Sequence, residues 1–169
     1  DSMLHLGAGV RRAESSGTLR YRGRPGVAAA DDYVDTGQFP ARASTHLAVE
    51  AQFAQGPLLV LGEYVHAAVD APEAGDPGFD GYYLLGSWML TGEVRDYDRT
   101  KGVMRRVVPR GRWGALELMA RYSAVDLDGG TVRGGRYDRI EIGLNWWATT
   151  RWKACLLYTS DAADDLLCV

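Results

Sequence analysis

Three arginines at alternate positions, Arg20, Arg22 and Arg24, form the most distinctive chemical pattern in this 169-residue chain. On a β-strand, alternate side chains share one face and lie about 6.6 Å apart. A planar guanidinium can pair two oxygens of a phosphate at once, and three such groups cannot be packed in an apolar core. The spacing therefore predicts a row of cations that faces an anion, with a solvated strand face as the alternative.

Further arginines occupy polar positions of other alternating runs, at Arg11, Arg121 and Arg139. We take them as additional candidates for an anion-binding face. Acidic residues share these polar positions, at Glu50, Glu63, Glu117 and Glu141. Arg121 and Glu141 are predicted to pair across neighbouring strands, an interaction of modest strength. The mixed signs leave open whether the face selects anions.

Catalytic and metal-binding patterns are absent from the sequence. His5, His46 and His66 fall on separate predicted strands, and no Ser/His/Asp order, HxxxH or CxxC spacing occurs. The Gly-rich segments Asp128-Gly129-Gly130 and Gly134-Gly135 lack the Lys-Ser/Thr and the helix of a phosphate-binding loop. The basic residues are not clustered as in a nucleic-acid-binding protein. We therefore predict no enzyme, no cofactor and no nucleic-acid partner.

A hairpin predicted over residues 113–147 positions several of these charges. Two runs alternate apolar and polar side chains around the turn-forming sequence DLDGG at 126–130. One predicted face is apolar, with Leu118, Tyr122, Ile142 and Trp146. The opposite face is charged, with Glu117, Arg121, Arg139 and Glu141.

Similar alternation predicts the remaining strands, at residues 3–11, 18–25, 45–55, 58–69, 81–91, 94–97 and from 151 onward. A turn at 14–17 separates the first two. Short connections are predicted at 55–57, 91–93 and 148–150, and longer ones at 26–43, 70–81 and 98–111. Short turns on one rim and long loops on the other are typical of an outer-membrane barrel.

The composition agrees with an all-β chain, since it contains 21 glycines, 9 tyrosines and 5 tryptophans. No run of about 18 apolar residues could form a transmembrane helix, but a barrel strand needs only about 9–11 alternating residues. Many aromatic residues lie near strand ends, where the lipid interfaces of a barrel would place them. The alternative is a ligand-binding β-barrel or sandwich without transport activity.

The last segment, CLLYTSDAADDLLCV at 155–169, has a different character. It resembles the translated adapter used in preparing sequencing libraries, and we predict that it is a non-native tail. A short amphipathic C-terminal helix is the alternative. Without the three aspartates of this tail, the acidic and basic residues of 1–154 balance.

Several blocks, in order, resemble the phosphate-selective porin O and P family of Gram-negative outer membranes. They include LRYRGRP at 19–25, VDTG at 34–37, QGP at 55–57 and GEY at 62–64. GYYLLGSWMLTGE at 81–93 continues the likeness, as do YDR at 97–99, ARYS at 120–123, VRGG at 132–135 and GLNW at 143–146.

This resemblance implies an antiparallel transmembrane β-barrel of roughly sixteen strands, assembled as a homotrimer in the bacterial outer membrane. The implied function is passive diffusion of small anions, among them phosphate or polyphosphate, through an arginine-lined lumen. Residues 1–154 would supply a later part of the barrel, without the N-terminal strands, the constricting loop and the closing strand. Such a fragment would leave two open sheet edges.

Overall fold

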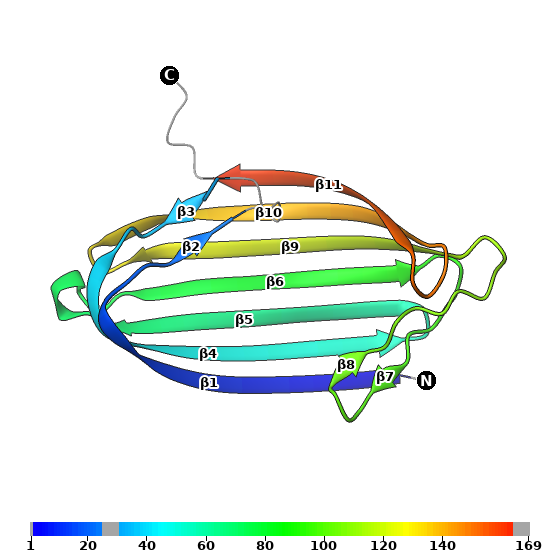
Figure 1. Cartoon of the computed structure of the whole chain (residues 1–169), viewed down its shortest axis with the longest axis horizontal. Helices are drawn as coiled ribbons and strands as arrows, with labels where there is room; N and C mark the ends of the chain where they lie inside the picture. Colours follow the sequence, from blue (N-terminus) through cyan, green and yellow to red (C-terminus); the bar gives the residue numbers. More distant parts are fainter. Residues whose placement is uncertain (1, 25–30, 164–169) are drawn as a thin grey trace, which may run out of the picture.

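The computed structural model describes residues 2–24 and 31–163, with the side chains of 161–163 left aside. In this part of the chain, long strands form one antiparallel sheet in the order β1-β4-β5-β6-β9-β10-β11 (Figure 1). Their bounds are β1 Ser2–Leu19, β4 Phe39–Gln55, β5 Leu58–Asp70, β6 Gly78–Met89, β9 Ala115–Gly129, β10 Val132–Trp147 and β11 Lys153–Ala163. The all-β antiparallel prediction is therefore confirmed. Within the described residues the sheet does not close into a barrel, and β1 and β11 are its two open edges.

Short elements lie in the connections between these strands. They are β2 Arg22–Gly23, β3 Val34–Asp35, the 3-10 turn η1 Pro72–Ala74, β7 Tyr97–Asp98 and β8 Val103–Met104. β2 pairs with β3, and β7 pairs with β8, each as a separate two-stranded ribbon. Among the described residues, no helix is long and apolar enough to cross a membrane.

Two-residue turns join β4 to β5 and β9 to β10. Gly56 and Gly130 begin these turns with φ values of 54° and 52°, a region that glycine enters without steric cost. Gly130 also lies against η1, because an added Cβ there would be 2.2 Å from the carbonyl oxygen of Ala74. The β9–β10 turn is thus shorter than the predicted one at 126–130, and both strands extend further toward it.

The turn predicted at 14–17 is wrong. β1 continues through these residues to Leu19, with a register shift against β4 between Glu14 and Gly17. The hydroxyl of Ser15 accepts a hydrogen bond from the Gly17 amide and donates one to the Thr18 carbonyl. The turn-forming residues therefore produce a bulge within a long strand instead of a reversal.

The predicted division into a short-turn rim and a long-loop rim is also wrong. Residues 20–38, 71–77 and 130–131 connect strands at one end of the sheet, and 56–57, 90–114 and 148–152 connect them at the other. The segment 91–93, predicted as a short turn, is only the beginning of the 90–114 connection. Each end consequently carries one long connection (Figure 1).

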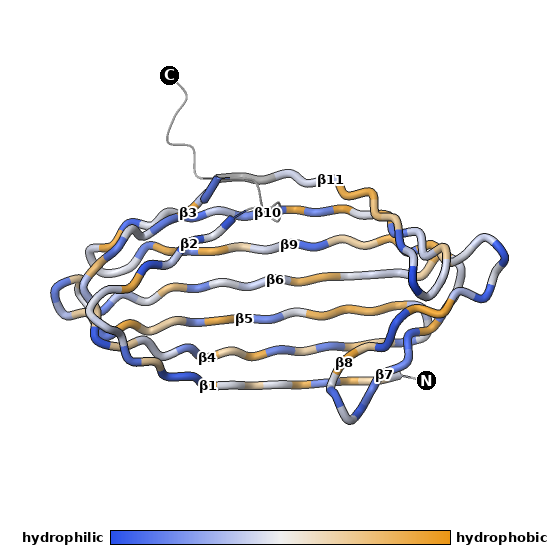
Figure 2. The backbone as a smooth tube through the Cα atoms, in the orientation of Figure 1, coloured by the Kyte–Doolittle hydropathy of each residue, from blue (hydrophilic) through white to orange (hydrophobic). Residues whose placement is uncertain are grey.

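The two faces of the sheet differ in polarity, and Figure 2 shows apolar and polar residues following one another along the long strands. We call the face over which the 20–38 and 90–114 connections fold the inner face, and the opposite one the outer face. The outer face exposes large apolar side chains: Leu4, Leu6, Leu47, Val49, Phe53, Leu58, Val60, Leu84, Leu116, Leu118, Ile140, Ile142 and Leu144. The inner face buries polar ones: Ser44, Ser87, Glu117, Arg139, Glu141 and Asn145. This polarity is the reverse of that of a water-soluble sheet.

Aromatic residues border the apolar area of the outer face. Tyr64 and Tyr82 are direct register partners toward one end, and Trp88 and Trp146 lie toward the other. Trp88 follows Tyr82 by six positions along β6, which corresponds to about 20 Å of strand. The predicted apolar face of the β9–β10 hairpin is therefore found, and it belongs to a wider band.

Apolar side chains do cluster on the inner face, but at its ends. The larger cluster includes Val34, Phe39, Phe79, Leu127 and Val132, and it lies under the 20–38 connection. The smaller one joins Met89, Val107 and Ala115 at the opposite end, with Trp147 packed against it. Between the two clusters the inner face is polar.

β11 contains residues 155–163 of the segment that we predict to be a non-native tail. It pairs with β10 from Trp147↔Lys153 to Tyr137↔Ala163. An open sheet edge offers unpaired backbone groups to any extended chain, so this pairing does not depend on which side chains the segment carries. The assignment of 155–169 as a tail stays a prediction.

Candidate functional site

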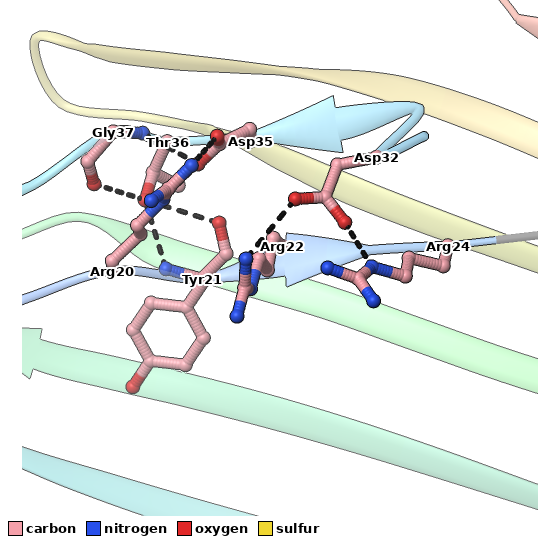
Figure 3. A network of polar contacts seen from close by, with 8 residues as sticks. All are labelled: Arg20, Tyr21, Arg22, Arg24, Asp32, Asp35, Thr36 and Gly37. Carbon is pink, nitrogen blue, oxygen red and sulfur yellow. Dashed lines mark hydrogen bonds and ion pairs between the residues drawn. The ribbon is translucent and has the colours of Figure 1, made fainter. Parts of the chain in front are cut away.

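The described parts of the 20–38 connection, residues 20–24 and 31–38, lie over the inner face, and the first part carries the three arginines. Arg20 binds Asp35 in a bidentate salt bridge: Nε donates to Oδ1 at 2.8 Å, and Nη2 donates to Oδ2 (Figure 3). Arg24 Nε lies 2.5 Å from Oδ1 of Asp32, and Arg22 Nη1 lies 3.3 Å from Oδ2 of the same residue. Two aspartates thus hold all three guanidinium groups.

These contacts shift the acidities of the paired groups. The hydrogen bond from Arg20, followed by that from the Gly37 amide, lowers the pKa of Asp35 from 3.8 to about 2. The hydrogen bond from Arg24 likewise lowers the pKa of Asp32, and Asp35 raises the pKa of Arg20. All these groups therefore carry full charge at neutral pH.

The predicted strand at 18–25, with its arginine row on one face, is wrong. β1 ends at Leu19, and β2 comprises only Arg22 and Gly23. Arg20 turns toward Asp35, whereas Arg22 and Arg24 share Asp32 (Figure 3). The sequence alone could not show that Asp32 and Asp35, which follow later in the same connection, pair with these arginines.

Apolar and hydroxyl contacts fix this connection to the sheet. Val34 is 2% exposed within the larger apolar cluster. The Tyr21 hydroxyl lies 2.6 Å from Ser44 Oγ and 3.0 Å from His46 Nε2 on β4. Gly134 on β10 permits the approach, because an added Cβ would lie 2.8 Å from Thr36 Cγ2 and 2.7 Å from Leu127.

The charged face predicted for the β9–β10 hairpin is present and points inward. Arg121 Nε lies 3.8 Å from Glu141 Oε2, which confirms the predicted cross-strand pair. Glu141 also binds Arg139, two residues away on the same strand. The guanidinium of Arg121 stacks over the ring of Tyr83 on β6, at 4.3 Å from its centroid.

Three of the predicted anion-binding residues meet at one cavity of about 440 Å3 between the 20–38 connection and the sheet. Arg24 contributes from the connection, and Arg121 and Arg139 contribute from the wall. Glu63, Tyr83 and Glu141 also line it. Arg11 lies apart from this cavity, exposed at the sheet edge opposite His46, and it makes no ion pair within the described residues.

The 90–114 connection covers the other end of the inner face and is fixed by Glu117. This carboxylate is 3% exposed and binds Arg95 of the connection and Ser87 of β6. It also accepts hydrogen bonds from Asn145 Nδ2 at 3.1 Å and Trp147 Nε1 at 3.0 Å. Glu117 was predicted to face inward, but its role as the anchor of a distant loop was not.

A second contact of the same connection reaches the opposite edge of the sheet. The Tyr97 hydroxyl lies 2.5 Å from Nδ1 of His5 on β1, whose Nε2 lies 3.1 Å from Glu50 on β4. The 90–114 connection thus spans the inner face from β1 to β10. The two apolar clusters occupy the ends of the inner face. The part of the inner face between them is polar, and we call it the polar middle zone.

Comparison with known proteins assigns the chain to a family. The family model described as "Phosphate-selective porin O and P" matches residues 7–165. The chain belongs to the phosphate-selective porin O and P family. The resemblance found in the sequence blocks is therefore confirmed.

This porin chain is also similar to an uncharacterized protein of Caulobacter vibrioides, with 33% identity over 156 residues. The match covers 86% of this chain and 31% of that relative, so the chain spans about a third of the relative's length. The open edges of the sheet, at β1 and β11, are consistent with a part of a larger barrel.

The histidines of the porin chain take part in separate contacts. His46 lies with Tyr21 and Ser44, and His66 pairs with Asp80 at 2.8 Å on the outer face. Within the described ranges, no group of three or more His, Cys, Asp or Glu side chains could hold a metal ion.

Proposed function

We propose that this chain forms part of an outer-membrane channel through which small anions, including phosphate or polyphosphate, diffuse passively. The reversal of polarity between the two faces of the sheet carries this proposal. An apolar outer face suits lipid, and a charged inner face suits a water-filled lumen. Membership of the porin family supports the same assignment.

The outer face fits the bacterial outer membrane in length as well as in polarity. Its apolar band of about 20 Å approaches the roughly 25 Å band of outer-membrane barrels, and tyrosines and tryptophans border it as interfacial girdles do. A ligand-binding sandwich would instead pack a second sheet on this face, and no described residue does so. We also propose a homotrimer, in which the rest of each protein completes the barrel.

The inner arginines would supply the anion path. Arg20, Arg22 and Arg24 on the connection and Arg121 and Arg139 on the wall would offer successive positive sites. Arg11 would offer another at the β1 edge. Most of these arginines also form an ion pair with a carboxylate, which reduces their affinity for a passing anion. Weak binding would allow the ion to leave each site, as conduction requires.

Planar-bilayer recordings of the complete porin that contains this chain test the proposal. A salt gradient should give a reversal potential on the anion side, and phosphate should block the chloride current. Replacing Arg20, Arg22 and Arg24 together by Ala should weaken this block by about tenfold, as expected for the loss of several weak charged contacts. A protein that forms no channel, or one that prefers cations, would contradict the function.

A matched triple variant isolates the role of position. Arg99, Arg106 and Arg112 of the 90–114 connection are exposed and form no ion pair among the described residues. Replacing these three by Ala removes the same charge and should leave phosphate block within about twofold of the original. Equal effects of both triple variants would assign the block to net charge instead of to the 20–38 connection.

A further inference from the structure

The polar middle zone of the inner face is not uniformly basic, because its charges are sorted by strand. One register row crosses the sheet through Glu50 on β4, Glu63 on β5, Tyr83 on β6, Ser123 on β9 and Arg139 on β10. Direct register partners point to the same face. Both acids thus lie on one side of Tyr83, and the arginine lies on the other.

The acidic side consists of two carboxylates directly opposite each other. Glu50 and Glu63 are register partners, an arrangement that like-charge repulsion disfavours. In the described part of the chain, neither forms an ion pair with Lys or Arg; Glu50 contacts the imidazole of His5 at 3.1 Å, and the Tyr83 hydroxyl donates a hydrogen bond to Glu63. Gly7 makes room for Glu50, because a Cβ there would lie 2.5 Å from Glu50 Oε1.

The other cations near this side do not neutralise it. Arg95 lines a cavity together with His5 and Glu50, but its guanidinium is bound to Glu117. Arg11 projects from β1 four residues beyond Gly7, at about 13 Å along the strand. Two negative charges therefore face the inner space largely uncompensated.

The basic side lies two to three strands away. Arg121 on β9 stacks on the Tyr83 ring, and Arg139 on β10 and Arg24 of the 20–38 connection line the same cavity as Glu63. Arg121 and Arg139 both contact Glu141, and Arg24 contacts Asp32 together with Arg22, so the guanidinium groups gather on this side of the row. Two strand spacings separate β5 from β9, which is about 10 Å.

We propose that this inner face is a bipolar recognition site for small zwitterionic solutes, which align their ammonium group with Glu50 and Glu63 and their anionic group with Arg121, Arg139 and Arg24. The inference rests on the proposed function, since it takes the inner face as the channel wall. An extended dipeptide separates its terminal charges by about 7 Å and fits the spacing once the long side chains reach inward. A simple anion, in contrast, is attracted by one side and repelled by the other.

Swelling of liposomes that contain the complete porin measures this preference. The probes are glycylglycine, which is zwitterionic, and N-acetylglycinamide, which is uncharged and of similar size. We expect glycylglycine to enter faster. The double variant Glu50→Gln/Glu63→Gln should lower the ratio of the two rates by about threefold, the effect of losing an exposed charged contact.

Two further variants make the result specific. Glu73→Gln removes one negative charge from the exposed η1 turn and should leave the ratio unchanged. Glu63→Asp keeps the charge and should retain most of the preference. An unchanged ratio in the double variant, with normal entry of the uncharged probe, would overturn the bipolar site and leave the channel proposal intact. Absence of both swelling and ion current would overturn the channel proposal and the bipolar site together.

Discussion

The two long connections that cover the inner face are held by opposite kinds of interaction. The 90–114 connection is anchored on Glu117, a carboxylate that is 3% exposed and has four side-chain partners. The 20–38 connection is held by ion pairs whose arginines are 42–50% exposed, and by the apolar contacts of Val34. A buried ion pair is costly to break, whereas exposed pairs contribute little and respond to salt.

The difference indicates a division of roles between the two ends of the inner face. The Glu117 anchor fixes one covering segment rigidly against β9 and β10. Under the proposed function, the exposed arginines of the other segment would exchange an aspartate for a passing anion, because both partners are already in contact with water. The charges that are proposed to meet the solute are thus on the weakly held connection.

Replacing Glu117 by Gln should have the largest effect. It leaves the Arg95 guanidinium, 20% exposed, without its counter-charge in a buried site. Removing one member of a buried pair typically costs about 3–5 kcal/mol, so we expect the complete porin to lose about 3 kcal/mol of unfolding free energy. Urea unfolding in detergent, followed by tryptophan fluorescence, measures the loss.

The partner substitution serves as the control for this experiment. Replacing Arg95 by Met as well removes the guanidinium group that Glu117→Gln leaves unpaired. The double variant should therefore be more stable than Glu117→Gln alone. A single variant as stable as the original protein would show that Glu117 is not the anchor.

Replacing Gly134 by Val should loosen the other connection. The added side chain would overlap Leu127 and Thr36, where even a Cβ lies at 2.7 and 2.8 Å. Overpacking of this kind costs about 1–3 kcal/mol and would lift residues 34–36 from the sheet. Labelling of Val34→Cys by a maleimide, in a Cys155→Ser/Cys168→Ser background, should accelerate by about tenfold.

Gly9 provides a matched site for the same substitution. An added Cβ at Gly9 meets no atom within 4 Å, so Gly9→Val should leave the labelling rate at Val34→Cys unchanged. Equal acceleration by both variants would mean that the sheet, and not the docking of the connection, has been disturbed.

The sequence predicted the faces of this protein better than its connections. Alternation of side chains assigned Leu118, Tyr122, Ile142 and Trp146 to the outer face, and Glu117, Arg121, Arg139 and Glu141 to the inner one, because the period of a strand is a local property. The same rule failed at Arg20, Arg22 and Arg24, since β1 ends at Leu19.

Contacts between distant segments explain what the sequence could not predict. Asp35 lies 15 residues from Arg20, Tyr97 lies 92 residues from His5, and Arg95 lies 22 residues from Glu117. The spacing between the two members of each pair follows neither the strand nor the helix period, so their contact could not be predicted from the sequence pattern. The block QGP at 55–57, by comparison, forms the predicted tight turn because its geometry depends on neighbouring residues.

Acid should release the 20–38 connection, because its ion pairs depend on ionised aspartates. The folded pKa of Asp35 is about 2 and its ordinary value is 3.8, so its pairing with Arg20 stabilises the docked state fully above the ordinary value. This stabilisation is lost as the pH falls through about 2. Cleavage of residues 20–38 by pepsin should therefore increase below pH 4, and Asp35→Asn should remove most of this dependence.

Salt should produce the smallest difference between the two connections. Raising the ionic strength from about 0.1 M to about 1 M shortens the Debye length from about 10 Å to about 3 Å, which screens the exposed pairs of Arg20, Arg22 and Arg24 but not a carboxylate buried among its donors. We expect labelling of Val34→Cys to rise by about twofold, while a cysteine replacing the buried Val107 of the 90–114 connection keeps its rate. An equal increase at both positions would contradict the distinction, because it would mean that the same screened pairs hold both ends.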